Sequence, residues 1–222
     1  MKPRVTSMVI YAGCALYLAV ARVLFTWFPV ELKNAGQAAD LAWPVIAAVA
    51  VAGLLGRAAA LRAGLPDLIE PDVSHRERFL APIGIGVGFG AAICLLDLVT
   101  PLGIDLNVRF PMALVLYPFG GVLTEIVYRL VALPVPLWLA GALFPRARGA
   151  AATYWVVAGL TSLLEPIGQL GAVQVTPGVA ATLFVHAYAF NLVLAALFRR
   201  AGFLAPLTMR LAYYVPWHLL RG

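Results

Sequence analysis

Long apolar runs separated by short polar links are the feature that most constrains this chain. The hydrocarbon core of a bilayer is about 30 Å thick and takes roughly 20 apolar residues in a helix. Runs of this kind occupy residues 5–28, 41–62, 79–100, 111–138, 152–171, 178–198 and 203–219. Lipid satisfies no backbone polar group, so such runs must be helical. We therefore expect an all-α fold, a polytopic transmembrane helix bundle of about seven spans.

The composition agrees with a membrane protein. Of 222 residues, 63% are hydrophobic and 12% are charged, against roughly 45–50% apolar and 25% charged in soluble domains. The lipid bilayer is thus the first expected partner. A net charge of +6 does not indicate a nucleic-acid partner, because the basic residues lie at helix ends. We expect a single transmembrane domain over 1–222, with three N-terminal helices in 1–110 and a helical core in 111–222.

The basic residues of the links predict the orientation. One side holds Lys2, Arg4, Arg57, Arg62, Arg76, Arg78, Arg146, Arg148, Arg199 and Arg200, and the other holds Lys33, Arg109 and Arg221. Cytoplasmic links carry the excess of Lys and Arg. The N-terminus is therefore expected in the cytoplasm, and the chain is expected to be a multi-pass protein of the cytoplasmic (inner) membrane.

Two local features complete the expected organisation. The polar link from Ala63 to Arg78 is expected to be a solvated cytoplasmic loop in which His75 is exposed. Pro134 and Pro136 are expected to kink or end the fourth span, because proline removes a backbone donor and clashes with the preceding turn.

Polar residues inside the spans are the candidate functional residues, because a charge in mid-bilayer costs about 2.5–3.5 kcal/mol on insertion scales. The last four spans carry Glu125 and Arg129, Glu165 and Gln169, His186 and Asn191, and Arg210 and Tyr214. Members of a pair spaced i,i+4 share one helix face. These residues either line a functional polar cavity, or form the ion pairs Glu125–Arg129 and Glu165–Arg210 that lock the bundle.

Other polar residues favour structural roles. Arg22 and Asp97 lie near the outer ends of their helices, where an arginine reaches the headgroup layer. Glu125, Glu165 and His186 make a conceivable metal set, but carboxylate and imidazole ligands alone select no metal. We assign no metal ligand, and the sequence requires no cofactor.

The segment TEIVYR, Thr124 to Arg129, is followed downstream by FNLVLAALFRRAGFLAPLTMRLAYY, Phe190 to Tyr214. Together they resemble the CAAX-processing and bacteriocin-processing (CPBP) family of intramembrane proteases. That family carries a Glu-Glu-x-x-x-Arg motif, a Phe-x-x-x-His motif and a His-x-x-x-Asn motif on successive helices. The resemblance covers about the last half of the chain and implies a CPBP-like core over 111–222.

The chain departs from the family at the motif positions. Thr124 stands where the family has the glutamate taken to activate water, and threonine is no general base. By spacing, Glu165 replaces the histidine of the second motif, although a shifted alignment puts Gln169 there. Arg210 and Tyr214 replace the histidine and asparagine of the third. The resemblance thus implies motif-site residues Glu125, Arg129, Glu165 and Arg210 with Thr124 and Tyr214, and a cavity lined by Gln169, His186 and Asn191.

These replacements predict a degenerate protease homologue, a pseudoenzyme that acts as a scaffold, binding or complex-assembly subunit. Its partners would be other membrane-protein subunits or a membrane-embedded peptide. One alternative is an active intramembrane endopeptidase in which Glu165 is the base, Arg210 or Arg129 stabilises the oxyanion, and His186 adds acid–base or metal-ligand chemistry. A second alternative is a small-molecule or proton-linked transporter, which the absence of a detectable inverted repeat disfavours.

Overall fold

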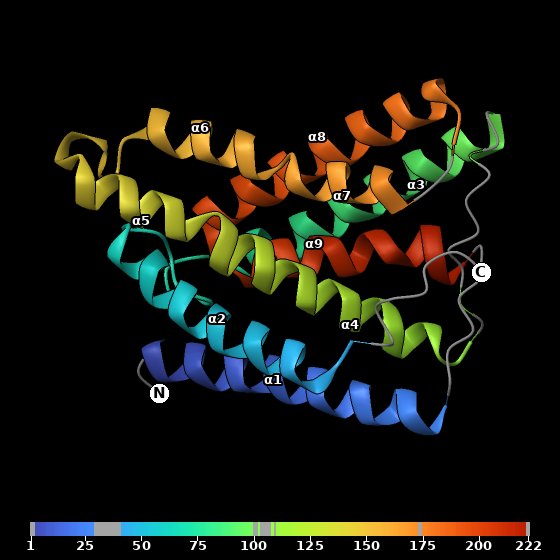
Figure 1. The fold of residues 1–222 in the computed structure, drawn as a ribbon, viewed down its shortest axis with the longest axis horizontal. Helices are drawn as coiled ribbons and strands as arrows, with labels where there is room; N and C mark the ends of the chain where they lie inside the picture. The colour runs from blue at the N-terminus through green and yellow to red at the C-terminus, as the bar shows by residue number, and fades with distance from the viewer. Residues whose placement is uncertain are drawn as a thin grey trace.

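The computed structural model describes residues 3–28, 41–99, 102, 108, 110–172 and 175–220. The helices run roughly along the long axis of the molecule (Figure 1). Their bounds are α1 Pro3–Trp27, α2 Trp43–Arg62, α3 Ala81–Val99, α4 Ala113–Glu125, α5 Pro134–Leu143, α6 Ala151–Thr161, α7 Leu164–Ala172, α8 Pro177–Ala201 and α9 Leu204–Tyr214. Wider π-helical turns occupy Arg76–Leu80, Ile126–Ala132 and Val215–Leu219, and Pro145–Ala147 forms a short 3-10 turn.

Five helices within the described part of the chain are long and apolar enough to cross a membrane. They span Arg4–Trp27, Trp43–Arg62, Arg76–Val99, Ala113–Leu143 and Pro177–Ala201. The all-α fold expected from the apolar runs is therefore confirmed, with five helices that could span a membrane where about seven spans were expected. The other two of the seven predicted spans are helical as well, but they form the interrupted pair α6–α7 and the short helix α9.

The predicted span 152–171 is not one continuous helix. It breaks at Ser162 and Leu163, between α6 and α7. The break lies four residues before Pro166, whose ring nitrogen cannot donate to the carbonyl of Ser162 and whose ring would clash with it in a continuous helix. Helix α6 packs against α5 and α8, while α7 packs against α8, so this pair lies at the periphery of the bundle.

The prolines of the fourth predicted span do not end it. Helical structure continues from Ala113 to Leu143. The wide π-helical turn Ile126–Ala132 comes directly before the α-helix that begins at Pro134. A π-turn of this kind accommodates a proline because it relieves the clash with the preceding carbonyl. The irregularity therefore falls one turn before Pro134, within the segment that carries Arg129.

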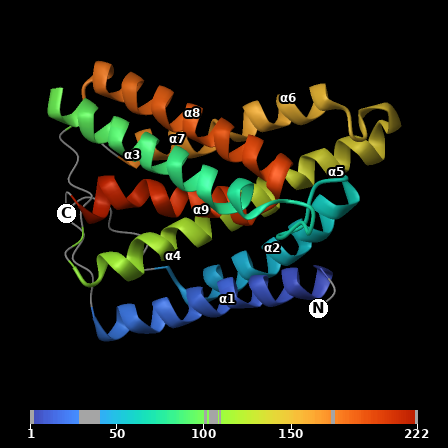
Figure 2. The ribbon, with the colours of Figure 1, turned by 180° about the vertical axis from the view of Figure 1, so that it is seen from behind.

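Helix α9 lies inside the bundle, in contact with α3, α4 and α8. Figures 1 and 2 show it between α4 on one side and α3 with α8 on the other. Two glycines allow α3 to approach it closely. A Cβ atom at Gly86 would come within 2.2 Å of the Met209 carbonyl oxygen, and one at Gly90 within 2.5 Å of the Tyr213 carbonyl oxygen. Much of α9 is thereby buried inside the bundle.

The link after α2 is only partly the solvated loop that its polarity predicts. His75 is exposed, as expected, but Asp67 and Leu68 are buried. The Phe203 and Leu204 amides donate to the Asp67 and Leu68 carbonyls at 3.4 and 3.3 Å. Gly202, at φ +80°, makes this approach possible, because a Cβ atom there would lie 2.3 Å from the Asp67 carbonyl oxygen. The link is therefore packed against the turn between α8 and α9.

Candidate functional site

Four charged side chains meet in the middle of the bundle. Arg210 on α9 is the centre of this group. Its Nε donates to Glu125 Oε1 at 2.5 Å, and its Nη1 and Nη2 donate to Glu165 Oε1 and Oε2 at 2.8 and 2.7 Å. One guanidinium therefore holds carboxylates from α4 and α7. We call Glu125, Arg129, Glu165 and Arg210 the core network.

The core network contains both expected ion pairs, Glu125–Arg129 and Glu165–Arg210, and a third pair, Glu125–Arg210, that was not expected. Glu125 lies closer to Arg210, at 2.5 Å, than to Arg129, at 3.5 Å from Nε. Arg129 also donates through Nη2 to the side-chain oxygen of Asn191 at 2.6 Å and to its carbonyl oxygen at 3.2 Å. The two expected pairs are thus present, but Arg210 joins them into one network by binding Glu125 as well. The i,i+4 spacing put both residues on one face but did not reveal that α9 approaches that face.

The core network is almost sealed. The side chains of Glu125 and Arg129 are 0% exposed, that of Arg210 is 3% exposed and that of Glu165 is 12% exposed. The two carboxylates balance the two guanidiniums, so the enclosed charge is neutral. Buried charges persist only when they are paired and hydrogen-bonded, because lipid and protein interior offer no solvation.

Local structure places each member of the core network. Glu125 ends α4, and Arg129 follows within the π-helical turn Ile126–Ala132. Glu165 lies in the first turn of α7, directly after the helix break, where the helix dipole favours a negative charge. Gly121 allows α9 to approach closely, since a Cβ atom there would lie 3.2 Å from Cδ2 of Leu211 and 3.2 Å from Cε2 of Tyr214.

The other residues expected at the site are only partly brought together. Gln169 donates to Glu165 Oε1 at 3.2 Å, and Asn191 binds Arg129 as described above. His186 lies elsewhere, among aromatic rings, with Phe89 at 5.4 Å and Tyr213 at 6.0 Å between centroids. It was expected to line the same cavity as the four charged residues, and its nearest ring contacts are with α3 and α9.

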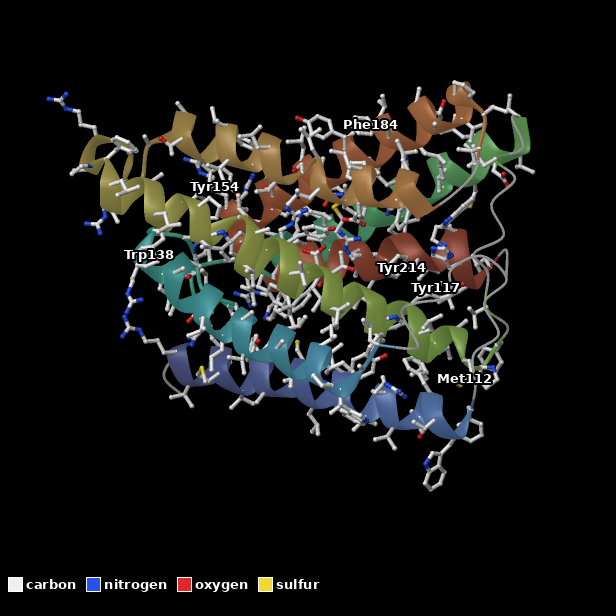
Figure 3. The ribbon with its side chains drawn as sticks, in the orientation of Figure 1. Met112, Tyr117, Trp138, Tyr154, Phe184 and Tyr214 are labelled. Carbon is white, nitrogen blue, oxygen red and sulfur yellow. The ribbon has the colours of Figure 1, made fainter. Side chains whose placement is uncertain are left out.

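Thr124 and Tyr214 lie on the elements that carry the core network. Thr124 precedes Glu125 on α4 and is half-buried. The Tyr214 ring lies 5.8 Å from that of Tyr117, on α4. Figure 3 shows Tyr214 and Tyr117 together, to one side of the polar side chains that gather near the middle of the bundle.

The metal set considered from the sequence is not assembled. Within the described residues, no group of three or more His, Cys, Asp or Glu side chains could hold a metal ion. Glu125 and Glu165 share Arg210, whereas His186 lies in the aromatic cluster. A guanidinium between the two carboxylates occupies the position that a cation would need.

A second buried charge pair was missed. Arg57 on α2 donates through Nε and Nη2 to Asp67 Oδ1 and Oδ2 at 2.6 and 2.5 Å. The Leu68 amide also donates to Asp67 Oδ1, at 2.8 Å, and Arg57 Nη1 contacts Met8 Sδ at 2.9 Å. We call Arg57 and Asp67 the loop pair. Its signal in the sequence was Arg57, which lies more than one turn inside its span.

Burial alone would raise the pKa of Asp67. The hydrogen bonds from Arg57 and from the Leu68 amide, together with the charge of Arg57, outweigh this effect and lower the pKa below its usual value. Asp67 therefore remains ionised in the folded protein, and the loop pair is a full ion pair.

The polar residues near the other end of the bundle have local structural contacts. Arg22 donates from Nε to the Leu41 carbonyl at 2.9 Å and lies over the Trp43 ring at 6.0 Å. Asp97 Oδ1 accepts from the Leu102 amide at 2.7 Å. These contacts join helix ends to the adjacent links, which is the structural role expected for both residues.

Comparisons of the chain with protein-family models, with curated proteins and with solved structures find no match.

Proposed function

We propose that this chain is a non-hydrolytic scaffold or binding subunit of the cytoplasmic membrane, built on a CPBP-like helical core. The observation that carries the proposal is the engagement of both core carboxylates by Arg210. A general base must accept a proton from water in a position open to that water. Both oxygens of Glu165 and one oxygen of Glu125 already accept hydrogen bonds from a guanidinium.

The replacements at the motif positions also support a non-hydrolytic role. Under the CPBP resemblance, Glu165 and Arg210 stand at the two histidine positions of the second and third motifs. These two residues form a bidentate pair, at 2.8 and 2.7 Å. Bidentate pairs fix geometry as well as charge. The two substitutions complement each other, which is expected if selection preserved the bundle after the chemistry was lost.

The proposed orientation rests on the distribution of arginines. Arg200 pairs with Glu77 at 2.6 Å, and Arg62 lies over the Trp138 ring at 5.9 Å. The first contact joins the end of α8 to the turn Arg76–Leu80, and the second joins the end of α2 to α5. Both lie toward the end of the bundle where α1 begins (Figure 1). An end rich in arginine faces the cytoplasm. The opposing residues Lys33, Arg109 and Arg221, and Lys2 on the proposed cytoplasmic side, lie outside the described residues.

The endopeptidase and transporter alternatives receive less support. A peptidase that uses Glu165 as base would need this carboxylate released from Arg210. A proton-linked carrier would need one of the paired charges to change partner during transport. Both steps would expose a charge in a region where the side chains of Glu125 and Arg129 are 0% exposed.

A hydrolysis assay tests the proposal. The wild-type protein, purified in detergent, is incubated with prenylated peptides and with leader-peptide substrates, next to a Glu165→Gln variant. We expect no turnover above the rate seen with an empty-membrane preparation. Turnover by the wild type that is lost in Glu165→Gln would overturn the proposal in favour of the peptidase.

Co-purification tests the scaffold role itself. Tagged protein is extracted from native membranes in a mild detergent, and its mass is compared with that of the purified chain. We expect a stoichiometric complex with another membrane protein. Repeated recovery of a lone monomer would contradict a scaffold or assembly role.

A further inference from the structure

Three buried polar atoms of the core network have no hydrogen-bond partner among the described residues. They are Glu125 Oε2, Arg129 Nε and Arg129 Nη1. Arg129 Nε and Glu125 Oε2 lie 3.5 Å apart, beyond the usual length of an N–H···O bond. Buried polar atoms are nearly always partnered by protein or by ordered water. Arg129 and Glu125 are therefore paired by charge, but two nitrogens and one oxygen that lie side by side make no hydrogen bond.

The unused donors cannot easily find a partner by rotation of Arg129. Its Nη2 is bound to both oxygens of Asn191, at 2.6 and 3.2 Å. Asn191 is itself fixed, because its Nδ2 donates to the Ala187 carbonyl at 3.0 Å on the same helix. A guanidinium is planar and rigid, so holding one nitrogen sets the directions of the others.

The charge balance of the core network limits which molecules can bind beside Arg129 and Glu125. The core network contains two carboxylates and two guanidiniums and is enclosed. An anion or a cation would add net charge to a sealed, low-dielectric region, which is costly. A neutral group adds none. Because Arg129 offers donors and Glu125 offers an acceptor, the occupant must carry both an acceptor and a donor.

We propose that Arg129 and Glu125 form a binding site for a small neutral molecule that both accepts and donates hydrogen bonds. Its oxygen accepts from Arg129, and its O–H or N–H donates to Glu125 Oε2. Water and a primary amide share this chemistry. The site does not depend on whether the protein is a scaffold, because it follows from the unpartnered atoms alone.

The experiment has two parts, one that tests for water and one that tests for a primary amide. In the first, a crystal structure from a lipidic mesophase is examined for an ordered water. We expect a density peak within hydrogen-bond distance of both Arg129 and Glu125 Oε2. In the second, acetamide is titrated against the wild type, with N,N-dimethylacetamide as the matched control that lacks a donor. Binding of acetamide would raise the unfolding midpoint by about 4 °C at about ten times its Kd, and dimethylacetamide would not.

Two variants test whether the water peak and the acetamide shift arise at Arg129 and Glu125. Arg129→Lys keeps the charge and removes the guanidinium fork, so it should abolish the water peak and the acetamide shift. Arg57→Lys makes the same exchange at the loop pair and should leave both unchanged. A peak with no acetamide shift identifies water as the occupant, and a specific acetamide shift identifies an amide site. No peak together with equal responses to the two amides would overturn the proposal, as would an acetamide shift that persists in Arg129→Lys.

Discussion

The loop pair and the core network are both buried ion clusters, but they are completed differently. Arg57 and Asp67 have a partner for every buried side-chain nitrogen and oxygen among the described residues, whereas the core network leaves three such atoms open. The chain can therefore close a buried charge cluster where it only ties a loop to a helix. The three open atoms of the core network, in the middle of the bundle, mark the site at which we propose that a small neutral molecule binds.

The backbone explains much of this contrast. Asp67 lies in a link, where the amide of Leu68 is available to donate to it. Glu125 and Arg129 lie within continuous helical structure, whose backbone amides already donate to carbonyls of the same helix. Carboxylates between helices must therefore accept from side chains. Arg210 donates to both oxygens of Glu165 but to only one oxygen of Glu125, and Asn191 accepts from only one nitrogen of Arg129.

The largest expected effect is the loss of Arg210. Arg210→Met would leave two buried carboxylates with Arg129 as the only remaining guanidinium of the core network, so we expect a loss of about 5 kcal/mol in the free energy of unfolding, the upper end for a broken buried pair. Thermal unfolding in detergent, followed by far-UV circular dichroism, measures it. Arg200→Met is the matched control, because the Arg200 side chain is 73% exposed, and it should change nothing measurable. Equal losses of unfolding free energy in the two variants would contradict the view that Arg210 stabilises the protein more than an exposed arginine does.

A smaller effect is expected at the loop pair. Arg57→Met strands one carboxylate that keeps the hydrogen bond from the Leu68 amide, so a loss of about 3 kcal/mol is expected. Combining it with Asp67→Leu should restore much of this loss, because no charge then remains buried. The same unfolding assay applies. A loss larger than that of Arg210→Met would reverse the ranking of the two clusters.

The smallest expected effect is the contribution of Asp67 to the pH dependence of the protein's stability. Its pKa is lowered in the folded state, so its stabilisation is fully present above the unfolded value, about 3.9. It is lost as pH falls from there through the folded value. The difference in unfolding midpoint between wild type and Asp67→Asn should be constant from pH 7 to pH 5 and shrink below pH 4. If the difference in unfolding midpoint between wild type and Asp67→Asn grew on acidification, the pKa of Asp67 would be raised in the folded protein and not lowered.

The sequence predicted most of the fold. Hydropathy alone placed the spans that became α1, α2 and α8 to within a few residues, because lipid leaves helices as the only choice. The break between α6 and α7 was not predicted. Pro166 was read as part of an apolar run, although its missing N–H disrupts the turn before it.

The candidate site was predicted in its members and in the ion pairs Glu125–Arg129 and Glu165–Arg210, but not in the contact between Glu125 and Arg210. A charged side chain is costly to bury in a membrane span, and on this ground the sequence predicted Glu125, Arg129, Glu165 and Arg210 as site residues. That Arg210 also binds Glu125 depends on how closely α9 approaches α4, and helical spacing along one chain segment carries no such information. The loop pair was missed because the link was judged by polarity, whereas Asp67 is buried by its contact with the turn at Gly202.

A double-mutant cycle between Glu165 and Arg210 tests most directly whether charges from separate helices form one interior network. The free energy of unfolding is measured for wild type, Glu165→Leu, Arg210→Met and the double variant, which leaves only the neutral combination of Glu125 and Arg129. We predict that the double variant is more stable than Arg210→Met alone, with a coupling energy of about 2–3 kcal/mol. Strictly additive losses would contradict the account, because they would mean that the two side chains do not interact in the folded protein.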